Sequence, residues 1–434
     1  MFYLPSPLHF ILLLVFSLNV NCWAELGQET IYLTWQQSPS TTMTIQWITS
    51  SRENQSVVAY RPLKGENQWQ KETGQVIHFP HAAYYTFHKV ELKNLQPNSE
   101  YQFKVSPYPE DYRFVTAPTH LEKELRFVVG GDMYHDDISF MIKTNQNAAK
   151  TAPLFALIGG DIAYAFKTGS FGLERIDRWI EWIKAWHTHM VTPDGHLIPV
   201  MSAIGNHDLN GGFDQTPAQA AVFSTLFPMP GNRIYNVLDF DSFLSIFILD
   251  SGHANPIGGK QADWLQTVLR ERQQVKHLFA IYHVPAYPSV RDFKNKYSDA
   301  IRKYWVPLFE KWGIQVAFEN HDHAYKRTRP LRQSQPHPEG ILYLGDGGWG
   351  IEKPREQKWK PHYIAKYDSV RHFICVTITS TEQHFRCIND QGEIMDEYIQ
   401  CMNKNKRAVE DPKKEKIEQS TQIEQQKMSR FIVQ

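Results

Sequence analysis

From Leu125 onward, short apolar runs alternate with stretches long enough to form helices. This alternation predicts an α/β domain in which helices flank layered sheets. The runs are Leu125–Val129, Leu154–Ile158, Ile198–Ile204, Phe243–Leu249, Leu278–Tyr282, Ile314–Phe318 and Ile341–Leu344. In the intervening stretch 174–186, one helical face carries Ile176, Trp179, Ile180, Ile183 and Trp186. We therefore interpret these tryptophans as packing residues and not as part of a cofactor site.

Five of these runs end in residues that can bind a metal ion. The endings are Gly130-Gly131-Asp132, Gly159-Gly160-Asp161-Ile162-Ala163-Tyr164, Gly205-Asn206-His207-Asp208, Tyr282-His283 and Glu319-Asn320-His321-Asp322-His323. Ligands of open α/β sheets bind beyond the carboxyl ends of the strands, so these groups are expected to converge on one edge. Each ending is a weak signal alone, but their combination in this order indicates a shared site.

The chemistry of this set favours a pair of metal ions. The candidate ligands are Asp132, Asp161, Tyr164, Asn206, His283, His321 and His323. Such oxygen and nitrogen donors, in this number, suit two neighbouring and partly open sites. A phosphate ester is anionic and repels hydroxide, whereas two metal ions roughly 3.5–4 Å apart neutralise it and activate a water. The set therefore predicts hydrolysis of phosphate esters.

The segment before this domain, residues 25–118, is predicted to be an all-β sandwich of the fibronectin III-like kind. Apolar and polar residues alternate in Thr30–Trp35, Met43–Ile48, Tyr85–Leu92 and Glu100–Val105, and a turn signal lies at 96–98. The segment contains no cluster of titratable residues, so we expect a structural role.

Composition excludes some classes of partner. The chain has 434 residues, 42% of them hydrophobic, and its 46 basic and 46 acidic side chains cancel. This composition is that of a globular protein. The charge balance gives no reason to expect nucleic acid or an anionic membrane as a partner.

The two ends of the chain carry no predicted site. The apolar run Phe10–Leu18 and the following Cys22-Trp23-Ala24 predict a signal peptide over residues 1–24, and hence a secreted, periplasmic or otherwise extracytoplasmic protein. An uncleaved anchor or a buried strand is the alternative. No later run reaches the roughly 18 apolar residues of a spanning helix, so no stable membrane insertion is expected. Residues 401–434 are charged and predicted to be a disordered tail.

The chain has four cysteines and no Cys-x-x-Cys pair, which argues against a thiolate metal site. In an oxidising compartment, Cys375 and Cys387 are candidates to bridge two C-terminal strands.

These motifs resemble those of the purple acid phosphatase family, within the calcineurin-like metallophosphoesterases. The family pattern of Gly-Asp, Gly-Asp-x-x-Tyr, Gly-Asn-His-Glu/Asp, a strand-end His and Gly-His-x-His-x-Tyr-x-Arg matches blocks that begin at residues 131, 160, 205, 283 and 320. The resemblance extends over about residues 25–387. It implies an N-terminal domain of the purple acid phosphatase type over 25–118 and a metallophosphoesterase catalytic domain over 125–400.

The resemblance also implies individual roles. A ferric ion would be bound by Asp132, Tyr164 and His323. A divalent ion (Zn, Fe or Mn) would be bound by Asn206, His283 and His321. Asp161 would bridge the two ions, one of each per subunit, and His207 would be catalytic, contacting the phosphoryl group and protonating the leaving oxygen. Asp208 is a candidate to orient the His207 imidazole.

The sequence departs from the family pattern in places. Asn320 stands where the family has Gly, which predicts a slightly altered turn before His321. The loop 284–292 lacks the extra histidines of plant-type members, and Tyr287 or Arg291 is the candidate substrate contact instead. His135, three residues after Asp132, is a weaker candidate for substrate contact.

The leading hypothesis is an acid phosphatase that hydrolyses small phosphorylated monoesters with a metal-bound hydroxide. The alternatives are a phosphodiesterase or nucleotide hydrolase on the same site, and an inactive secreted binding protein. All seven ligand positions are filled, which favours an active enzyme.

Overall fold

The computed structural model describes residues 30–50, 54–65, 68–106, 108–166 and 172–402. The predicted signal peptide and all of the predicted tail beyond residue 402 lie outside these ranges. Among the residues described, no helix has both the length and the apolar character needed to cross a bilayer.

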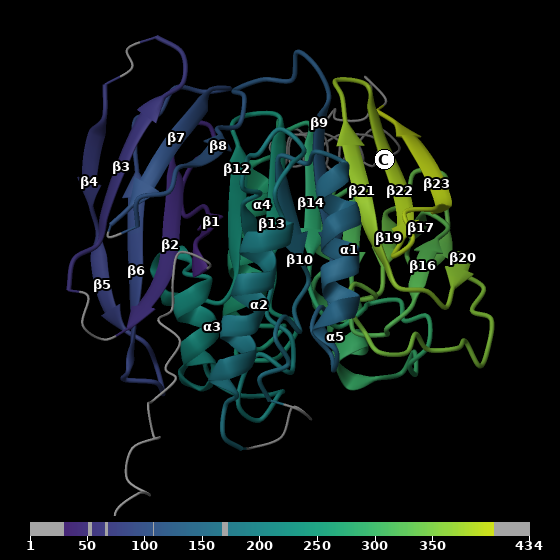
Figure 1. The fold of residues 1–434 in the computed structure, drawn as a ribbon. Helices are drawn as coiled ribbons and strands as arrows, with labels where there is room; N and C mark the ends of the chain where they lie inside the picture. The colour runs from purple at the N-terminus through teal and green to yellow at the C-terminus, as the bar shows by residue number, and fades with distance from the viewer. Residues whose placement is uncertain (1–29, 51–53, 66–67, 107, 167–171, 403–434) are drawn as a thin grey trace, which may run out of the picture.

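The N-terminal region is a sandwich of two four-stranded antiparallel sheets, as predicted (Figure 1). One sheet has the order β1 (Tyr32–Thr34), β2 (Met43–Ser50), β6 (Tyr85–Leu92), β5 (Gln75–His78). The other has the order β4 (Gln70–Thr73), β3 (Val57–Pro62), β7 (Glu100–Val105), β8 (Tyr112–Val115). The sequence did not predict β3, β4, β5 and β8. The residues of β4 and β5 are mostly exposed and carry no apolar stripe.

The second region contains two larger mixed sheets. The six-stranded sheet has the order β11 (Val200–Ser202), β10 (Phe155–Ile158), β9 (Leu125–Gly130), β21 (His372–Ile378), β22 (Glu382–Asn389), β23 (Ile394–Cys401). The seven-stranded sheet has the order β12 (Asn236–Phe240), β13 (Leu244–Ile248), β14 (His277–Ile281), β15 (Val316–Glu319), β19 (Leu342–Gly345), β16 (Tyr325–Thr328), β20 (Ile364–Asp368). All seven predicted apolar runs are strands of these sheets.

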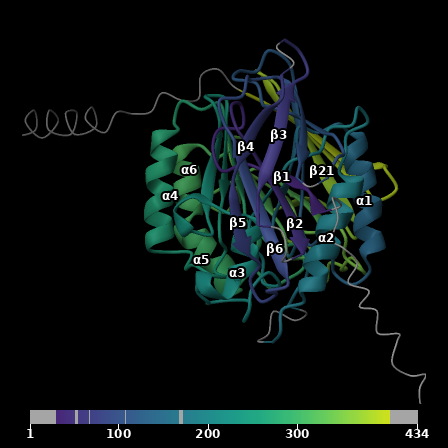
Figure 2. The same cartoon turned by 60° about the vertical axis from the view of Figure 1, so that its left-hand side comes forward.

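The two sheets face each other, and helices cover their outer faces (Figure 2). Between the sheets, Phe127 packs against Phe279 with 6.0 Å between ring centroids. The next residue of β9, Val128, points to the opposite face of the sheet, where it belongs to the same buried cluster as the helix residue Trp179. Strands buried on both faces therefore read as continuous apolar runs.

The helices divide between the two outer faces (Figure 2). The six-stranded sheet is covered by α1 (Ile138–Lys150) and α2 (Ile176–His189). The seven-stranded sheet is covered by α4 (Lys260–Glu271), α5 (Lys296–Tyr304) and α6 (Val306–Trp312), and the short α3 (Ala221–Leu226) lies nearer the sandwich. Trp179 and Trp186 of α2 are buried, which confirms their interpretation as packing residues, and Trp182 is buried as well.

The sandwich packs directly on the second region. Trp35, next to β1, contacts the rings of Phe155 and Phe240 at centroid distances of 6.0 and 5.8 Å. The Tyr32 hydroxyl donates a hydrogen bond to the Leu226 carbonyl at 2.8 Å. The sandwich thus supports one flank of both large sheets, consistent with its predicted structural role.

The predicted bridge between Cys375 and Cys387 is wrong. Cys375 lies opposite Arg386 in the β21–β22 pair, so the two cysteines are one register position apart. Neighbouring register positions face opposite sides of a sheet. Cys375 therefore packs on the helix side and Cys387 between the sheets, and both are free thiols.

Candidate metal centre

The predicted ligands lie at the carboxyl ends of parallel strands from both large sheets. The six-stranded sheet supplies Asp132 after β9, Asp161 and Tyr164 after β10, and Asn206 after β11. The seven-stranded sheet supplies His283 after β14, and His321 and His323 after β15. The structure brings all seven side chains together in two neighbouring groups, which meet where the His321 backbone N–H donates to Asp132 Oδ2 at 2.9 Å.

The first group joins Asp132, Tyr164 and His323. The Tyr164 hydroxyl lies 3.0 Å from Asp132 Oδ1 and 3.1 Å from His323 Nε2. Asp132 Oδ1 and His323 Nε2 are 2.9 Å apart. Three potential ligand atoms of different chemistry thus point at one another in a triangle.

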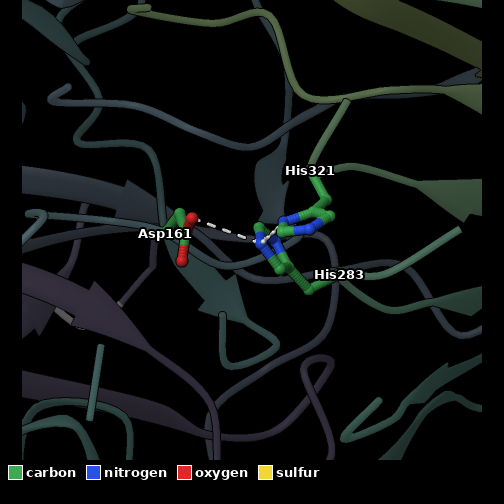
Figure 3. A group of neighbouring side chains, drawn as sticks. All are labelled: Asp161, His283 and His321. Atoms are coloured by element: carbon green, nitrogen blue, oxygen red, sulfur yellow. Dashed lines mark hydrogen bonds and ion pairs between the residues drawn. The ribbon is translucent and has the colours of Figure 1, made fainter. Parts of the chain in front are cut away.

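The second group is centred on His283 (Figure 3). His283 Nε2 lies 3.2 Å from Asp161 Oδ2, 2.9 Å from His321 Nδ1 and 3.2 Å from Asn206 Oδ1. One potential ligand atom from each of Asp161, His283 and His321 lies within 4.8 Å of the other two. His283 Nδ1 lies 2.8 Å from the Gly159 carbonyl, so that this nitrogen carries the proton and Nε2 faces the group.

The spacing within each group fits a metal ion. Metal–ligand bonds of about 2.1 Å at right angles place neighbouring ligand atoms about 3.0 Å apart. The ligand–ligand distances in the two groups run from 2.9 to 3.2 Å. The first group combines a phenol, a carboxylate and an imidazole, and the second combines a carboxylate, an amide and two imidazoles.

The backbone at these positions is strained. Asp132, Asp161, Tyr164, His321 and His323 have φ values of 57°, 52°, 49°, 77° and 60°. Such left-handed conformations are unfavourable for residues other than glycine, and they concentrate at functional sites. Five of the seven candidate ligands thus sit on backbone that the surrounding structure must hold in place.

Asn320 occupies space that two glycines leave open. Its Nδ2 donates a hydrogen bond to the Tyr282 carbonyl at 2.9 Å. A Cβ on Gly159 would lie 1.7 Å from Asn320 Nδ2, and a Cβ on Gly131 would lie 2.5 Å from its Oδ1. Asn320 therefore connects the end of β14 to the turns after β9 and β10, and His321 after it still reaches the second group.

Electrostatics couple Asp161 to His283. Burial alone would raise the pKa of Asp161, but the positive charges of His283 and His207 outweigh burial and hold that pKa below its usual value. Burial alone would lower the pKa of His283, but Asp161 and Asp132 raise it to about 9. Each group therefore favours the charged form of the other, and a metal ion bound by Nε2 would displace the second proton of His283.

The phenol of Tyr164 and the ring of His321 behave differently. Burial, followed by the charges of Asp132 and Asp161, raises the pKa of Tyr164 well above its usual value. Burial and the charge of Arg291 lower the pKa of His321. His321 therefore offers a neutral imidazole, and Tyr164 keeps its proton unless a strong cation displaces it.

His207 lies at the edge of the centre. Its Nδ1 is 2.6 Å from the Phe166 carbonyl, so that this nitrogen carries a proton and Nε2 points toward Asp161 Oδ2, 3.8 Å away. Its ring stacks on Tyr164 at a centroid distance of 4.4 Å. The side chain lines an adjacent cavity, where it can reach a substrate.

Asp208 does not orient His207, contrary to prediction. Its two oxygens accept hydrogen bonds from the backbone N–H groups of Asp161, Ile162 and Gly205, each at 2.8 Å. Asp208 therefore ties the turn after β10 to the turn after β11. The partner that orients His207 is a backbone carbonyl, which sequence motifs do not reveal.

A cavity of about 320 Å³ opens beside the second group. Asn206, His207 and His321 form its inner end, and Arg291 lines its wall. The other candidate for substrate contact, Tyr287, is buried. Its hydroxyl oxygen lies 2.9 Å from Ser334 Oγ, so the side chain packs away from the metal centre.

His135 lies next to the first group, but none of the ligand-to-ligand distances given above involves its ring nitrogens. Its ring meets Tyr164 edge-on at a centroid distance of 4.9 Å and pairs with Asp136 at 2.8 Å. The structure therefore places it as a neighbour of the centre.

Behind the β15 loop lies a buried ionic cluster that the sequence did not predict. Lys326 Nζ pairs with Glu319 at 2.6 Å and with Asp346 at 3.3 Å, and all three side chains are fully buried. Burial lowers the pKa of a lysine, but here Asp346, Glu319 and Asp322 outweigh it and raise the pKa of Lys326. This cluster braces the segment that carries His321 and His323.

Lys326→Met should lower the free energy of unfolding by about 3–5 kcal/mol, because it leaves buried carboxylates without their cation. Chemical denaturation followed by tryptophan fluorescence measures the change. Lys366→Met is the matched control, since Lys366 pairs with Asp368 at 3.7 Å with 38% of its side chain exposed. Its effect should stay within about 0.5 kcal/mol. Equal effects of the two substitutions would contradict a bracing role for the cluster.

Comparison with known families decides where the chain belongs. Residues 28–117 match the purple acid phosphatase N-terminal domain, and residues 125–325 match the calcineurin-like phosphoesterase domain. The chain belongs to the purple acid phosphatase family. The first match covers the β-sandwich, and the second covers most of the two-sheet domain that follows it.

Relatives within the purple acid phosphatase family are distant. The chain is 22% identical to mouse acid phosphatase type 7, over 91% of this chain and 96% of that protein. It is 26% identical to an uncharacterised Mycobacterium tuberculosis protein, over 61% of this chain but only 58% of that protein's length. Among solved structures, the purple acid phosphatase PPD1 of yellow lupin matches with a TM-score of 0.70 at 17% identity, over 85% of this chain and 73% of that one. This likeness shows the fold.

Proposed function

We propose that this chain is a phosphomonoesterase with one ferric and one divalent ion (Zn, Fe or Mn) per subunit. The observation that supports it best is the convergence of two ligand groups beside a cavity of about 320 Å³. In this proposal Asp161 bridges the ions. The ferric ion would be held by Asp132, Tyr164 and His323, and the divalent ion by Asn206, His283 and His321.

When bound, the two ions would neutralise the phosphate oxygens and lower the pKa of the attacking water. The residues supply position and proton transfer. The reacting phosphoryl group would lie at the end of the cavity lined by Asn206 and His321, beside His207. A P–O bond to the water oxygen forms, and the P–O bond to the leaving group breaks.

In the proposal, His207 supplies the proton for the leaving oxygen. Its Nδ1–H is committed to the Phe166 carbonyl at 2.6 Å, so Nε2 is the nitrogen that faces the substrate. In the protonated imidazole this Nε2–H donates to the departing oxygen, which leaves as an alcohol. The water that attacked becomes part of the inorganic phosphate product.

The substrates in this proposal are small phosphorylated molecules, since the cavity volume is at the lower end for small-molecule sites. Export of the protein, suggested by residues 1–24, belongs to the same proposal. It places the hydrolysis outside the cytoplasm.

Purified full-length protein should contain iron and a second metal by elemental analysis, and it should hydrolyse phenyl phosphate. Removal of both metals by chelation should lower kcat at least about 10³-fold, because several kcal/mol of charge stabilisation are lost. Returning the metals should restore the activity.

A visible charge-transfer band, from Tyr164 on ferric iron, provides an independent readout. Tyr164→Phe should remove the band, whereas Tyr134→Phe, which changes a tyrosine bonded to Glu181 instead, should keep it. Metal-loaded protein without hydrolytic activity toward any phosphomonoester would contradict the proposed function.

A further inference from the structure

The cavity beside the second ligand group has an unequal distribution of charge. The described residues that line the cavity include no carboxylate. Apart from the two histidines at its inner end, Arg291 is the one titratable basic residue among them. The neighbouring wall is apolar, with Val284, Pro285 and Pro288. A single guanidinium on a mostly neutral wall favours an anionic group in the cavity.

The Arg291 guanidinium is held in a fixed position. Its Nε lies 3.3 Å from Asp322 Oδ1, and its Nη2 donates to the His321 carbonyl at 3.3 Å. Asp322 Oδ2 accepts the backbone N–H groups of Val290 and Arg291 at 2.7 and 3.2 Å, which fixes the loop as well. Asp322 is fully buried, whereas the Arg291 side chain is 36% exposed. The guanidinium is therefore oriented in advance, with donor capacity remaining toward the cavity.

A second arginine strengthens the positive potential at this edge. The Arg355 backbone N–H donates to the His323 carbonyl at 2.9 Å. Burial lowers the pKa of Arg355 and the charge of Arg291 lowers it further, whereas Asp132 and Asp322 raise it. Arg355 does not line the cavity, so Arg291 is the guanidinium that an anion there would meet.

The size of the cavity limits what the anion can belong to. At about 30 Å³ per water-sized group, 320 Å³ holds roughly ten non-hydrogen atoms. The reacting phosphoryl group is proposed to occupy the inner end, at Asn206, His207 and His321. The remaining space fits a small leaving group next to Arg291.

We infer that Arg291 selects small phosphomonoesters whose leaving group carries a second anionic group, such as a carboxylate or a further phosphate. This inference rests on the proposed function, because it assigns the substrate class of the same site. A bidentate or single charge-assisted hydrogen bond from Arg291 would hold the second anion while the ester is cleaved. Arg291 is thus a specificity-determining residue.

Matched substrate pairs test the inference. One pair is phosphoglycolate and its carboxamide, and the other is 3-(phosphonooxy)propanoate and its carboxamide. Each pair differs in one negative charge at nearly constant shape, and the two pairs place that charge at different distances from phosphorus. Metal-loaded wild-type protein should prefer the carboxylate in at least one pair. In Arg291→Gln the ratio of the two kcat/KM values should fall about 10- to 100-fold, as expected for loss of a charge-assisted hydrogen bond.

Lys294→Gln is the matched control, because it removes one positive charge from the same loop at an exposed side chain outside the cavity lining. It should keep the wild-type ratio. Arg291→Lys should keep part of the preference, and metal content should be unchanged in every variant. A wild type that cleaves both members of each pair equally, or an Arg291→Gln protein that keeps the preference, overturns the inference alone. Absence of hydrolysis of all four compounds by metal-loaded wild type counts against the proposed function instead.

Discussion

Asp161→Asn is expected to release metal from both positions of the centre and to lower kcat by about 10³–10⁴-fold, since several kcal/mol of charge stabilisation depend on the ions. Asp161 lies 3.2 Å from His283 in the second group, and its charge also acts on Tyr164 in the first. The amide keeps the shape of the side chain, including an oxygen for the His207 N–H at 2.7 Å. The loss therefore reports on the missing charge. Elemental analysis and single-turnover hydrolysis measure the two effects.

Asn206→Ala is the comparison variant for that experiment. Asn206 contacts His283 at 3.2 Å but makes no contact with the first group among the described residues. It should deplete mainly the divalent ion and keep the iron. If the two variants lost the same single metal, Asp161 would not be the shared ligand.

His207→Ala should keep both metals and the visible band, yet reduce kcat about 10²–10⁴-fold on alkyl phosphates, whose leaving groups need a proton. The structure leaves Nε2 of His207 facing the cavity because Nδ1 is bonded to the Phe166 carbonyl. A nitrophenolate leaving group needs less protonation, so kcat on nitrophenyl phosphate should fall less. Steady-state kinetics on both substrates give the comparison.

His135→Ala serves as the control for His207. Both rings contact Tyr164, at centroid distances of 4.9 and 4.4 Å, but His135 does not line the cavity. Its removal should change kcat less than tenfold on either substrate. Wild-type rates for His207→Ala on alkyl phosphates would exclude the acid role.

The sequence predicted the positions of the candidate ligands because strand ends are visible in it. A buried parallel strand is a short apolar run, and the polar residue after it must lie at the edge of the sheet. This argument places Asp132 and His283 at strand ends, with 150 residues of chain between them (133–282). Their strands belong to two different sheets, and the sequence did not predict that the ends of the two sheets meet. Glycines at 131 and 160 further indicate the sharp turns that hold the two aspartates.

Other features depend on contacts that sequence position does not reveal. Asp208 follows His207 directly, yet its oxygens bond to backbone on a different turn. Lys326, in a Tyr-Lys-Arg stretch, resembles a surface residue but is fully buried with Glu319. Cys375 and Cys387 lie on neighbouring strands, which made them candidates for a disulfide, but they are offset by one register position and therefore lie on opposite faces of the sheet. In each case the outcome depends on which atoms meet across the fold.

The packing of Asn320 over Gly159 makes the effect of a mutation at one position conditional on the residue at the other. A methyl group at 159 would overlap the buried amide of Asn320, 1.7 Å away, and that amide is held by the Tyr282 carbonyl. A shorter residue at 320 would make room for the methyl group, at the cost of that hydrogen bond. We therefore expect substitutions at these two positions to be epistatic, with a methyl group at 159 better tolerated when residue 320 has a shorter side chain.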